Sequence, residues 1–298
     1  MRVNPQYMTD LVSSLDATSL TEQTLTQELA SGSQVNSLSD NPVAVGENVL
    51  LSAQIGSDDS FSQTASTTGS MLQVSDSALS TVVSQLTSAI SLATQANNGA
   101  LNSSDVQSIS NQLAGIRDEV LSIANTTYLG RYVFSGGKGG TAPYTLNSGV
   151  SPVVATYHGD GDVQYLQTPN GQKIQLNVPG SQIFSQAGSD VLGTLNQLVA
   201  DFASGTPSAT VVADTEALNT ALSYVSQQRV VIDNSITRLT TAENYTQSEQ
   251  TQLTSVQTNL LQADVGKIAT QLSSAETQQA ALSQVIAAMG KQSLFNDL

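Results

Sequence analysis

The stretch that decides the fold is VQSISNQLAGIRDEVLSI, residues 106–123, because its apolar residues recur at a helical spacing. Steps of three and four residues alternate along Val106, Ile109, Leu113, Ile116, Val120 and Ile123. This spacing places all of them on one face of an α-helix, in a narrow seam suited to packing against a second helix. The pattern favours burial inside the chain's own core and leaves a subunit interface as the alternative.

The same period extends towards the N-terminus in two further seams. One comprises Leu72, Leu79, Val83, Leu86, Ile90 and Ala93, and the other comprises Met8, Leu11, Leu15, Leu25 and Leu29. Between them lies Asn41-Pro42. An Asn side chain can cap a helix, and proline at the first helical position loses no hydrogen bond. The sequence therefore predicts a loop over 31–40 and a helix that begins at Pro42.

The C-terminal third carries two heptad frames. The first comprises Leu218, Leu222, Val225, Ile232, Ile236, Leu239, Leu253 and Leu260, interrupted by polar residues such as Arg229 and Thr246. The second comprises Val265, Ile268, Leu272, Ala275, Gln279, Leu282, Ile286 and Met289. A single helix over 212–262 would be about 76 Å long at 1.5 Å per residue, so we expect an elongated molecule. The step of five residues between the frames predicts a joint near Asp264.

The centre of the chain has a different pattern. Apolar residues alternate with polar ones along Val153, Ala155 and Tyr157 and along Ile174, Leu176 and Val178, as in strands. Asn170-Gly171 separates two such runs and predicts a two-residue type I′ hairpin turn. A short helix over about 189–203, with Val191, Leu195, Leu198 and Phe202 on its apolar face, leads back to the long helix.

Together these patterns predict a mainly α fold, in which coiled-coil helical arms from both termini flank an inserted small β domain. We expect a terminal layer from residues 1–40 and 265–298 and a helical bundle layer from residues 41–135 and 206–264. The remaining residues, 136–205, form a β-rich outer domain in this scheme.

Charge excludes two classes of partner. The chain carries 24 acidic and 9 basic residues, and there is no Lys or Arg between Arg2 and Arg117. Nucleic-acid binding needs clustered cations, and so does adsorption to an acidic lipid surface. No run approaches the roughly 18 apolar residues of a membrane span, and no cleavable signal peptide is recognisable. We expect no nucleic-acid partner and no membrane insertion.

Catalytic and metal-binding patterns are also missing. The chain has no cysteine, and His158 is its one histidine. Asp160 and Asp162 follow His158 and raise the alternative of a metal site, but a turn is favoured because such a site needs three or four converging ligands. The Gly136–Gly140 run lacks the Ser or Thr that follows Lys in a phosphate-binding loop. We expect no enzyme activity and no cofactor.

Several motifs resemble the bacterial flagellin family. Residues 29–42, with Leu29-Ala30-Ser31-Gly32 and Asn36-Ser37-Leu38-Ser39-Asp40-Asn41-Pro42, are similar to the N-terminal signature of flagellins, and so is Gln95-Ala96-Asn97-Asn98-Gly99. The stretch Gly130-Arg131-Tyr132-Val133-Phe134-Ser135-Gly136 resembles the hook–filament junction branch of that family, as does Ser293-Leu294-Phe295-Asn296. The resemblance covers both arms, and the centre fits it more loosely.

The resemblance implies a structural subunit of the flagellum. It implies an adaptor at the hook–filament junction that assembles with copies of itself and joins the hook-side junction protein to flagellin or the filament cap. It also implies an extracellular protein, exported unfolded without signal cleavage, with terminal helices that order on assembly. An export chaperone would cover the C-terminal seam beforehand. Alternatives are a minor filament flagellin and, in a different class, an exported adhesin or enzyme acting through the central β domain.

The resemblance and the seams together nominate two sets of residues. We expect the assembly interface to comprise Leu11, Leu15, Leu25, Leu29, Val265, Ile268, Leu272, Leu282, Ile286 and Met289. The family motif positions are Asn36, Asp40, Asn41, Pro42, Gly130, Arg131, Phe134, Gly136 and Phe295.

Overall fold

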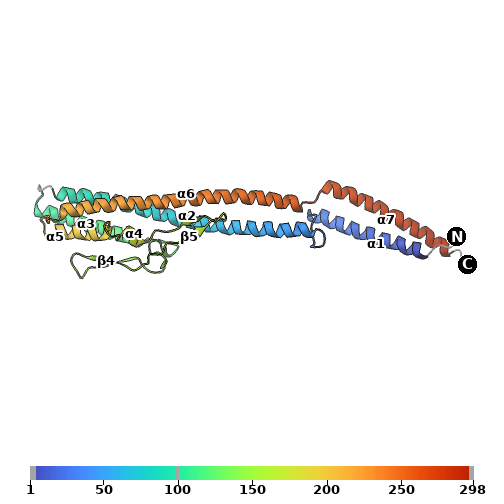
Figure 1. The fold of residues 1–298 in the computed structure, drawn as a ribbon, viewed down its shortest axis with the longest axis horizontal. Helices are drawn as coiled ribbons and strands as arrows, with labels where there is room; N and C mark the ends of the chain where they lie inside the picture. Colours follow the sequence, from blue (N-terminus) through green and yellow to red (C-terminus); the bar gives the residue numbers. More distant parts are fainter. Residues whose placement is uncertain (1–4, 98–100, 295–298) are drawn as a thin grey trace. The chain divides into compact units, whose positions relative to one another are not determined.

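The structure is a computed structural model that describes residues 5–97 and 101–294 and is mainly α-helical (Figure 1). Its contacts divide the chain into two compact units, which we describe separately. Unit 1 comprises Met1–Ser57 and Ser248–Leu298, and unit 2 comprises Asp58–Gln247. Small antiparallel strand pairs accompany the helices in unit 2. The predicted fold class, mainly α with a small β region between helical arms, is confirmed.

The described helices are α1 (Pro5–Ser31), α2 (Pro42–Ala96), α3 (Ser103–Ala124), α4 (Gly180–Ile183), α5 (Val191–Ala203), α6 (Val211–Leu261) and α7 (Val265–Leu294). The single helix predicted over 212–262 is α6. The predicted joint near Asp264 is also confirmed, because α7 begins directly after it. The Asp264 carboxylate accepts a hydrogen bond of 3.0 Å from the Lys267 N–H, so this residue caps α7.

The start of α2 confirms the reading of Asn41-Pro42. Asn41 Oδ1 accepts a hydrogen bond from the Ala44 N–H at 3.1 Å, and Pro42 is the first helical residue. At the other end of the loop, α1 stops before Gly32, whose φ of 68° lies in the left-handed region. Both loop ends are therefore set by local residue chemistry.

Helices α2 and α6 each bury a heptad stripe, although the sequence placed two positions of each stripe one residue too far along the chain. On α2 the stripe comprises the buried residues Asp58, Phe61, Ala65, Thr68, Leu72, Ser75, Leu79, Val82, Leu86, Ala89, Ala93 and Ala96. Leu72, Leu79, Leu86 and Ala93 were predicted, whereas the expected Val83 and Ile90 are half-buried beside Val82 and Ala89.

The same shift occurs on α6. Leu218, Val225, Ile232 and Leu239 are buried as predicted. The intervening buried positions are Ala221 and Ser235, while the expected Leu222 and Ile236 lie half-buried at the edge of the stripe. At Ala89, Ala221 and Ser235 the buried residue is smaller than the neighbouring residue that was expected there, so a pattern read from large apolar residues missed these positions.

Helix α3 packs inside unit 2. Val106, Ile109, Leu113 and Val120 belong to the same core cluster as the buried residues of α2, α5 and α6. Ser110 Oγ also donates to the Val199 carbonyl oxygen of α5 at 2.8 Å. The 106–123 seam is therefore intramolecular core, as the sequence favoured.

The strands form separate two-stranded ladders. They are β1 (Thr127–Tyr128), β2 (Arg131–Tyr132), β3 (Tyr144–Asn147), β4 (Val154–Tyr157), β5 (Tyr165–Gln167) and β6 (Lys173–Gln175). β1 pairs with β2, β3 with β4 and β5 with β6. The predicted helix over about 189–203 is α5, whose N-terminus is capped by Asp190 through the Gly193 N–H at 2.8 Å.

The predicted type I′ turn at Asn170-Gly171 is wrong. Gly171 has a φ of 83°, but Asn170 is not among the described residues with positive φ. The Gly171 N–H instead bonds to the Thr168 carbonyl oxygen at 2.9 Å, which closes a turn with Pro169 at its second position. Proline holds φ near −65°, so the chain forms a three-residue loop of the type I plus bulge kind.

A tight two-residue hairpin occurs instead between β1 and β2. Leu129 and Gly130 form its tip, with φ values of 49° and 76°. Two successive positive φ values at the centre of a two-residue loop define the type I′ turn. Sequence analysis missed it because leucine is not a residue that this turn favours.

Candidate assembly surface

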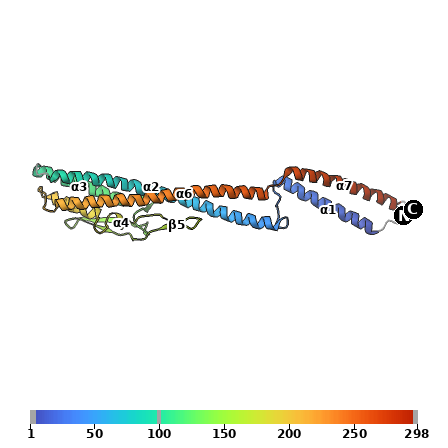
Figure 2. The ribbon, with the colours of Figure 1, turned by 45° about the horizontal axis from the view of Figure 1, so that its top comes forward.

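Helices α1 and α7, which carry the predicted interface residues, pack against each other in unit 1. These two helices lie side by side in both ribbon views (Figures 1 and 2). Leu25, Ala263 and Ile268 form one buried cluster, and Leu272 packs against this cluster. Here the structure brings together residues that are more than two hundred positions apart in the sequence.

The rest of this seam is open. Leu11, Leu15, Leu282, Ile286 and Met289 are half-buried. Leu29 and Val265 are exposed, at 39% and 55%. Ordering an unpacked helix costs conformational entropy that partial burial offsets poorly. The α1–α7 pair therefore presents apolar side chains that its own chain does not cover.

Further exposed apolar residues lie in unit 1 that sequence reasoning missed. Leu38, Val43, Val49 and Leu50 are between 60% and 72% exposed, and Val256 on α6 is 53% exposed. Single exposed apolar residues are ordinary, but a concentration of them marks an interaction surface. For Val43, Val49 and Leu50 the available signal was an apolar residue off the seam of α2, since such positions are usually polar.

The loop between α1 and α2 holds the first group of motif residues. Asp40 accepts hydrogen bonds from the N–H groups of Asn36 and Ser37, at 3.0 and 2.7 Å, and from Ser37 Oγ at 2.6 Å. The Ser37 hydroxyl, followed by these two N–H groups, lowers the pKa of the Asp40 carboxyl. Asp40 therefore closes the loop as an anion, and these motif positions shape the entry into α2.

This loop also pairs with the end of α6. The Gln34 N–H donates to the Leu261 carbonyl oxygen at 2.8 Å, and the Ala263 N–H donates to the Gly32 carbonyl oxygen at 3.0 Å. Gln34 Nε2 adds a third bond, to the Leu260 carbonyl oxygen at 2.8 Å. Within unit 1, these bonds tie the N-terminal connection to the C-terminal one.

The second group of motif residues lies in unit 2. Phe134 is buried, and its ring meets that of Phe184 edge-on at 5.4 Å. Its carbonyl oxygen accepts from the Gly180 N–H at 2.7 Å and from the Tyr157 hydroxyl at 3.0 Å. Desolvation raises the pKa of Tyr157, so this hydroxyl stays protonated as a donor. Phe134 is thus a structural anchor.

Gly136 is required by its surroundings. Its φ is 69°, and a Cβ there would overlap both a carboxylate and a main-chain oxygen of Asp160. The neighbouring Gly137 N–H donates to Asp160 Oδ1 at 2.6 Å. Gly130 and Arg131 lie apart from this contact, at the β1–β2 hairpin, and Phe295 lies outside the described residues. The motif positions are therefore distributed over several local structures.

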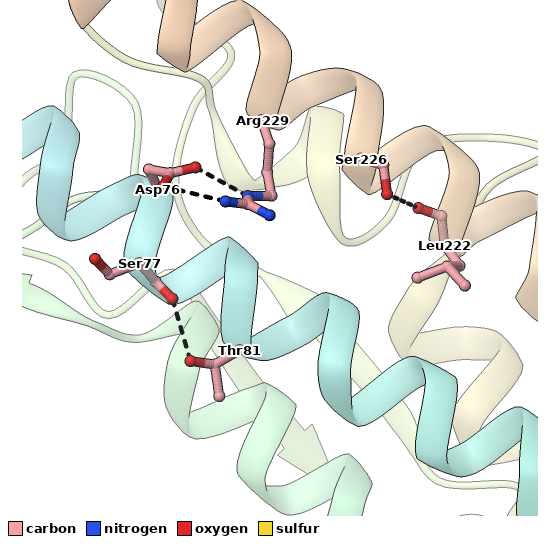
Figure 3. A network of polar contacts seen from close by, with 6 residues as sticks. All are labelled: Asp76, Ser77, Thr81, Leu222, Ser226 and Arg229. Atoms are coloured by element: carbon pink, nitrogen blue, oxygen red, sulfur yellow. Dashed lines mark hydrogen bonds and ion pairs between the residues drawn. The ribbon is translucent and has the colours of Figure 1, made fainter.

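Arg229, a polar residue within the predicted α6 seam, forms an ion pair with α2. Arg229 of α6 donates to both carboxylate oxygens of Asp76 on α2, at 2.9 and 3.2 Å (Figure 3). The Asp76 hydrogen bonds raise the pKa of Arg229. Nearby, Thr81 and Ser226 donate to carbonyl oxygens one helical turn earlier. A forked pair of this kind adds register specificity to an apolar seam.

The remaining candidates show no reactive arrangement. His158 Nε2 lies 2.8 Å from Thr145 Oγ1 on the neighbouring strand. Across the described ranges, no three His, Asp or Glu residues converge as metal ligands. None of the helices there has the length and apolar character needed to cross a membrane.

Comparisons with known proteins identify the fold. The bacterial flagellin N-terminal helical region family matches residues 4–138. Flagellar hook-associated protein 3 of Salmonella typhimurium is 28% identical over 194 residues, which cover 64% of this chain and 59% of the relative. The protein of the same name from Escherichia coli is 27% identical over 167 residues, covering 56% and 51%. The chain thus spans between half and three fifths of these relatives.

Two solved structures share the fold. A putative flagellar hook-associated protein from Vibrio parahaemolyticus has a TM-score of 0.66 at 22% identity, covering 75% of this chain and all of that one. Flagellar hook-associated protein-3 from Legionella pneumophila has a TM-score of 0.62 at 15% identity, covering 71% and 98%. The chain is therefore similar in sequence to the flagellin N-terminal helical region and to hook-associated protein 3, and it shares its fold with these hook-associated proteins.

Proposed function

We propose that the chain is a structural subunit of the flagellum that acts as an adaptor at the hook–filament junction. It assembles with copies of itself and joins the hook-side junction protein to flagellin or the filament cap. The open apolar seam between α1 and α7 carries this proposal, because half-buried leucines such as Leu15 and Leu282 gain burial when further helices pack on them.

The layers predicted from sequence fit this role. Residues 1–40 and 265–298 would form the innermost layer, residues 41–135 and 206–264 a second helical layer, and residues 136–205 an outer region. Export in the unfolded state would precede assembly, with a chaperone covering the α7 seam. The chain's 11% charged residues suit this arrangement, since few charges have to be desolvated between layers.

Ile286→Asp in the full chain tests the seam. A carboxylate there opposes burial between subunits but remains hydrated in the free chain, so we expect a folded, soluble monomer that does not assemble. Ser283→Asp is the matched control, because Ser283 lies exposed three residues earlier on α7. Electron microscopy of flagella and flagellin released into the medium report the result. Filaments retained by the Ile286→Asp strain would refute the assignment of this seam.

A strain that lacks the protein separates the adaptor from a minor flagellin. Hooks without filaments, with unpolymerised flagellin in the medium, support the adaptor. A normal hook with an altered filament supports the minor flagellin instead.

The adhesin or enzyme alternative needs point substitutions rather than removal of residues 140–205. Tyr144, Ile174 and Phe184 belong to the same core cluster as the helices of unit 2, so a deletion would disrupt folding as well. His158→Ala changes an exposed side chain and leaves that core intact. Normal motility and filament attachment in this variant would argue against a function centred on the histidine.

A further inference from the structure

The tip of the β1–β2 hairpin combines two unfavourable features. Leu129 has a φ of 49°, which is unusual for a residue other than glycine, asparagine or aspartate. Its side chain is 78% exposed, the highest value among the exposed large apolar residues of the described chain. Neither the backbone nor the side chain of Leu129 therefore stabilises the free subunit.

Asparagine or glycine would form the same turn with less strain. The left-handed conformation brings Cβ close to the backbone carbonyl oxygen, and an exposed leucine recovers little of this cost by burial. Strained residues of this kind concentrate at contact and switch sites, where another interaction offsets their cost. The observed strain thus points to a contact made outside the described subunit.

The neighbouring Arg131 specifies the chemistry of that contact. It is exposed, and among the described residues no carboxylate lies within ion-pair distance of its guanidinium. We call Leu129, Gly130 and Arg131 the hairpin tip. It carries an exposed apolar side chain and, two residues later, an exposed cation whose guanidinium lies over Gly139. Its complement is an apolar surface that carries a carboxylate.

The outer face of α6 offers this complement. Val230 is 57% exposed and Asp233 lies three residues later, also exposed. Val212, 54% exposed, is followed at a spacing of four by the exposed Glu216. Residues three or four apart lie on one helix face, so each pair joins an apolar side chain to an acidic one.

We propose that the hairpin tip docks on the outer face of α6 of a second copy of this chain, with Leu129 against Val230 and Arg131 beside Asp233. A second copy is favoured because the chain has a net charge of −15 and therefore offers an acidic surface to the Arg131 cation. This contact rests on the proposed function, since it requires neighbouring copies in one assembly.

Disulfide trapping tests the contact, and the cysteine-free chain supplies a clean background. Two differently tagged full-length copies, one with Leu129→Cys and the other with Val230→Cys, are expressed together and assembled flagella are oxidised. We expect a disulfide-linked species that carries both tags. Leu129→Cys paired with Val154→Cys, which is 50% exposed on β4, is the control. Equal yields in the two pairings, or a link to another protein, would overturn the proposal.

Leu129→Asn provides a second measurement that does not depend on trapping. We expect its melting temperature to rise by about 2–4 °C as the backbone strain is relieved, while filament attachment becomes weaker under shear. A higher melting temperature with unchanged attachment would contradict the docking role. If the wild-type chain itself fails to restore filaments in a strain that lacks it, the proposed function has failed before this contact is reached.

Discussion

Units 1 and 2 both contain long helices with heptad stripes, yet they differ in how many apolar residues of these stripes are buried. In unit 2 the stripes of α2, α3 and α6 close into one cluster with α5 and the strand region. In the described part of unit 1, burial is confined to Leu25, Ala44, Ala263, Ile268 and Ala275. The difference is one of partners, because α3 and α5 cover the long helices of unit 2. The same heptad spacing of apolar residues can therefore form either the core of a subunit or an exposed apolar surface.

The largest expected effect that tests this comparison comes from paired leucine truncations. Leu79→Ala should lower the free energy of unfolding by about 2–5 kcal/mol, because Leu79 is completely buried in unit 2. Leu15→Ala should cost about 1 kcal/mol or less in the free chain, because Leu15 is half-buried. Urea denaturation followed by far-ultraviolet circular dichroism measures both values. Equal decreases in the free energy of unfolding would mean that Leu15 and Leu79 are buried to the same degree.

A second comparison uses two glycines with nearly the same backbone. Gly32 in unit 1 and Gly136 in unit 2 have φ values of 68° and 69°. A Cβ at Gly32 meets nothing within 4 Å, so Gly32→Ala should cost about 1–2 kcal/mol from the backbone alone. Gly136→Ala adds overlap with Asp160 and should cost about 2–4 kcal/mol. Thermal unfolding of the two variants measures the difference, and a smaller loss at Gly136 would contradict the packing described.

The smallest expected effect concerns pH. The pKa of Asp40 in unit 1 is lowered from 3.8 by its hydrogen bonds, so its contribution to stability is present above pH 3.8 and is lost as pH falls through the lowered value. The pKa of Asp214 in unit 2 is raised, by desolvation first and then by a hydrogen bond with Asp201. Its contribution is present below pH 3.8 and is lost as pH rises through the raised value.

Substitution with asparagine separates these opposite signs. At pH 7, Asp40→Asn should loosen the loop before α2, whereas Asp214→Asn should stabilise the start of α6. Amide hydrogen exchange of residues 32–41 and 210–216 reports each effect locally. Protection that changes in the same direction in both segments would show that the two carboxyls do not differ as described.

Much of the fold was predictable from local chemistry. The boundaries of α2, α6 and α7 follow from Asn41-Pro42, from the heptad frame that starts at Leu218 and from the change of frame near Asp264. Such signals lie within a few residues of the feature that they specify. The candidate site was less accessible, because whether Leu15 or Leu282 is covered depends on elements far away in the sequence.

The errors have specific physical causes. Ile90, Leu222 and Ile236 were expected in the seam because they are large and apolar, but the smaller Ala89, Ala221 and Ser235 occupy the buried positions. Val82 and Val83 are the same residue type, so their sequence could not tell which of the two is buried. At Asn170-Gly171 the preceding Pro169 selected a longer loop. Leu129 occupies a turn position that favours glycine or asparagine. Because leucine is unfavourable at a positive φ, the sequence there does not predict a turn.

The sequence by itself determined the helical periods, the caps, the joint near Asp264 and the absence of cysteine chemistry, because each depends on neighbouring residues or on composition. The sequence favoured an internal 106–123 seam, but the tertiary structure decided how far each seam is closed. It buried the 106–123 stripe against α5 and left the α1–α7 seam half open. Burial is a property of the elements that surround a residue, and a periodic pattern identifies the face of a helix without specifying what covers it.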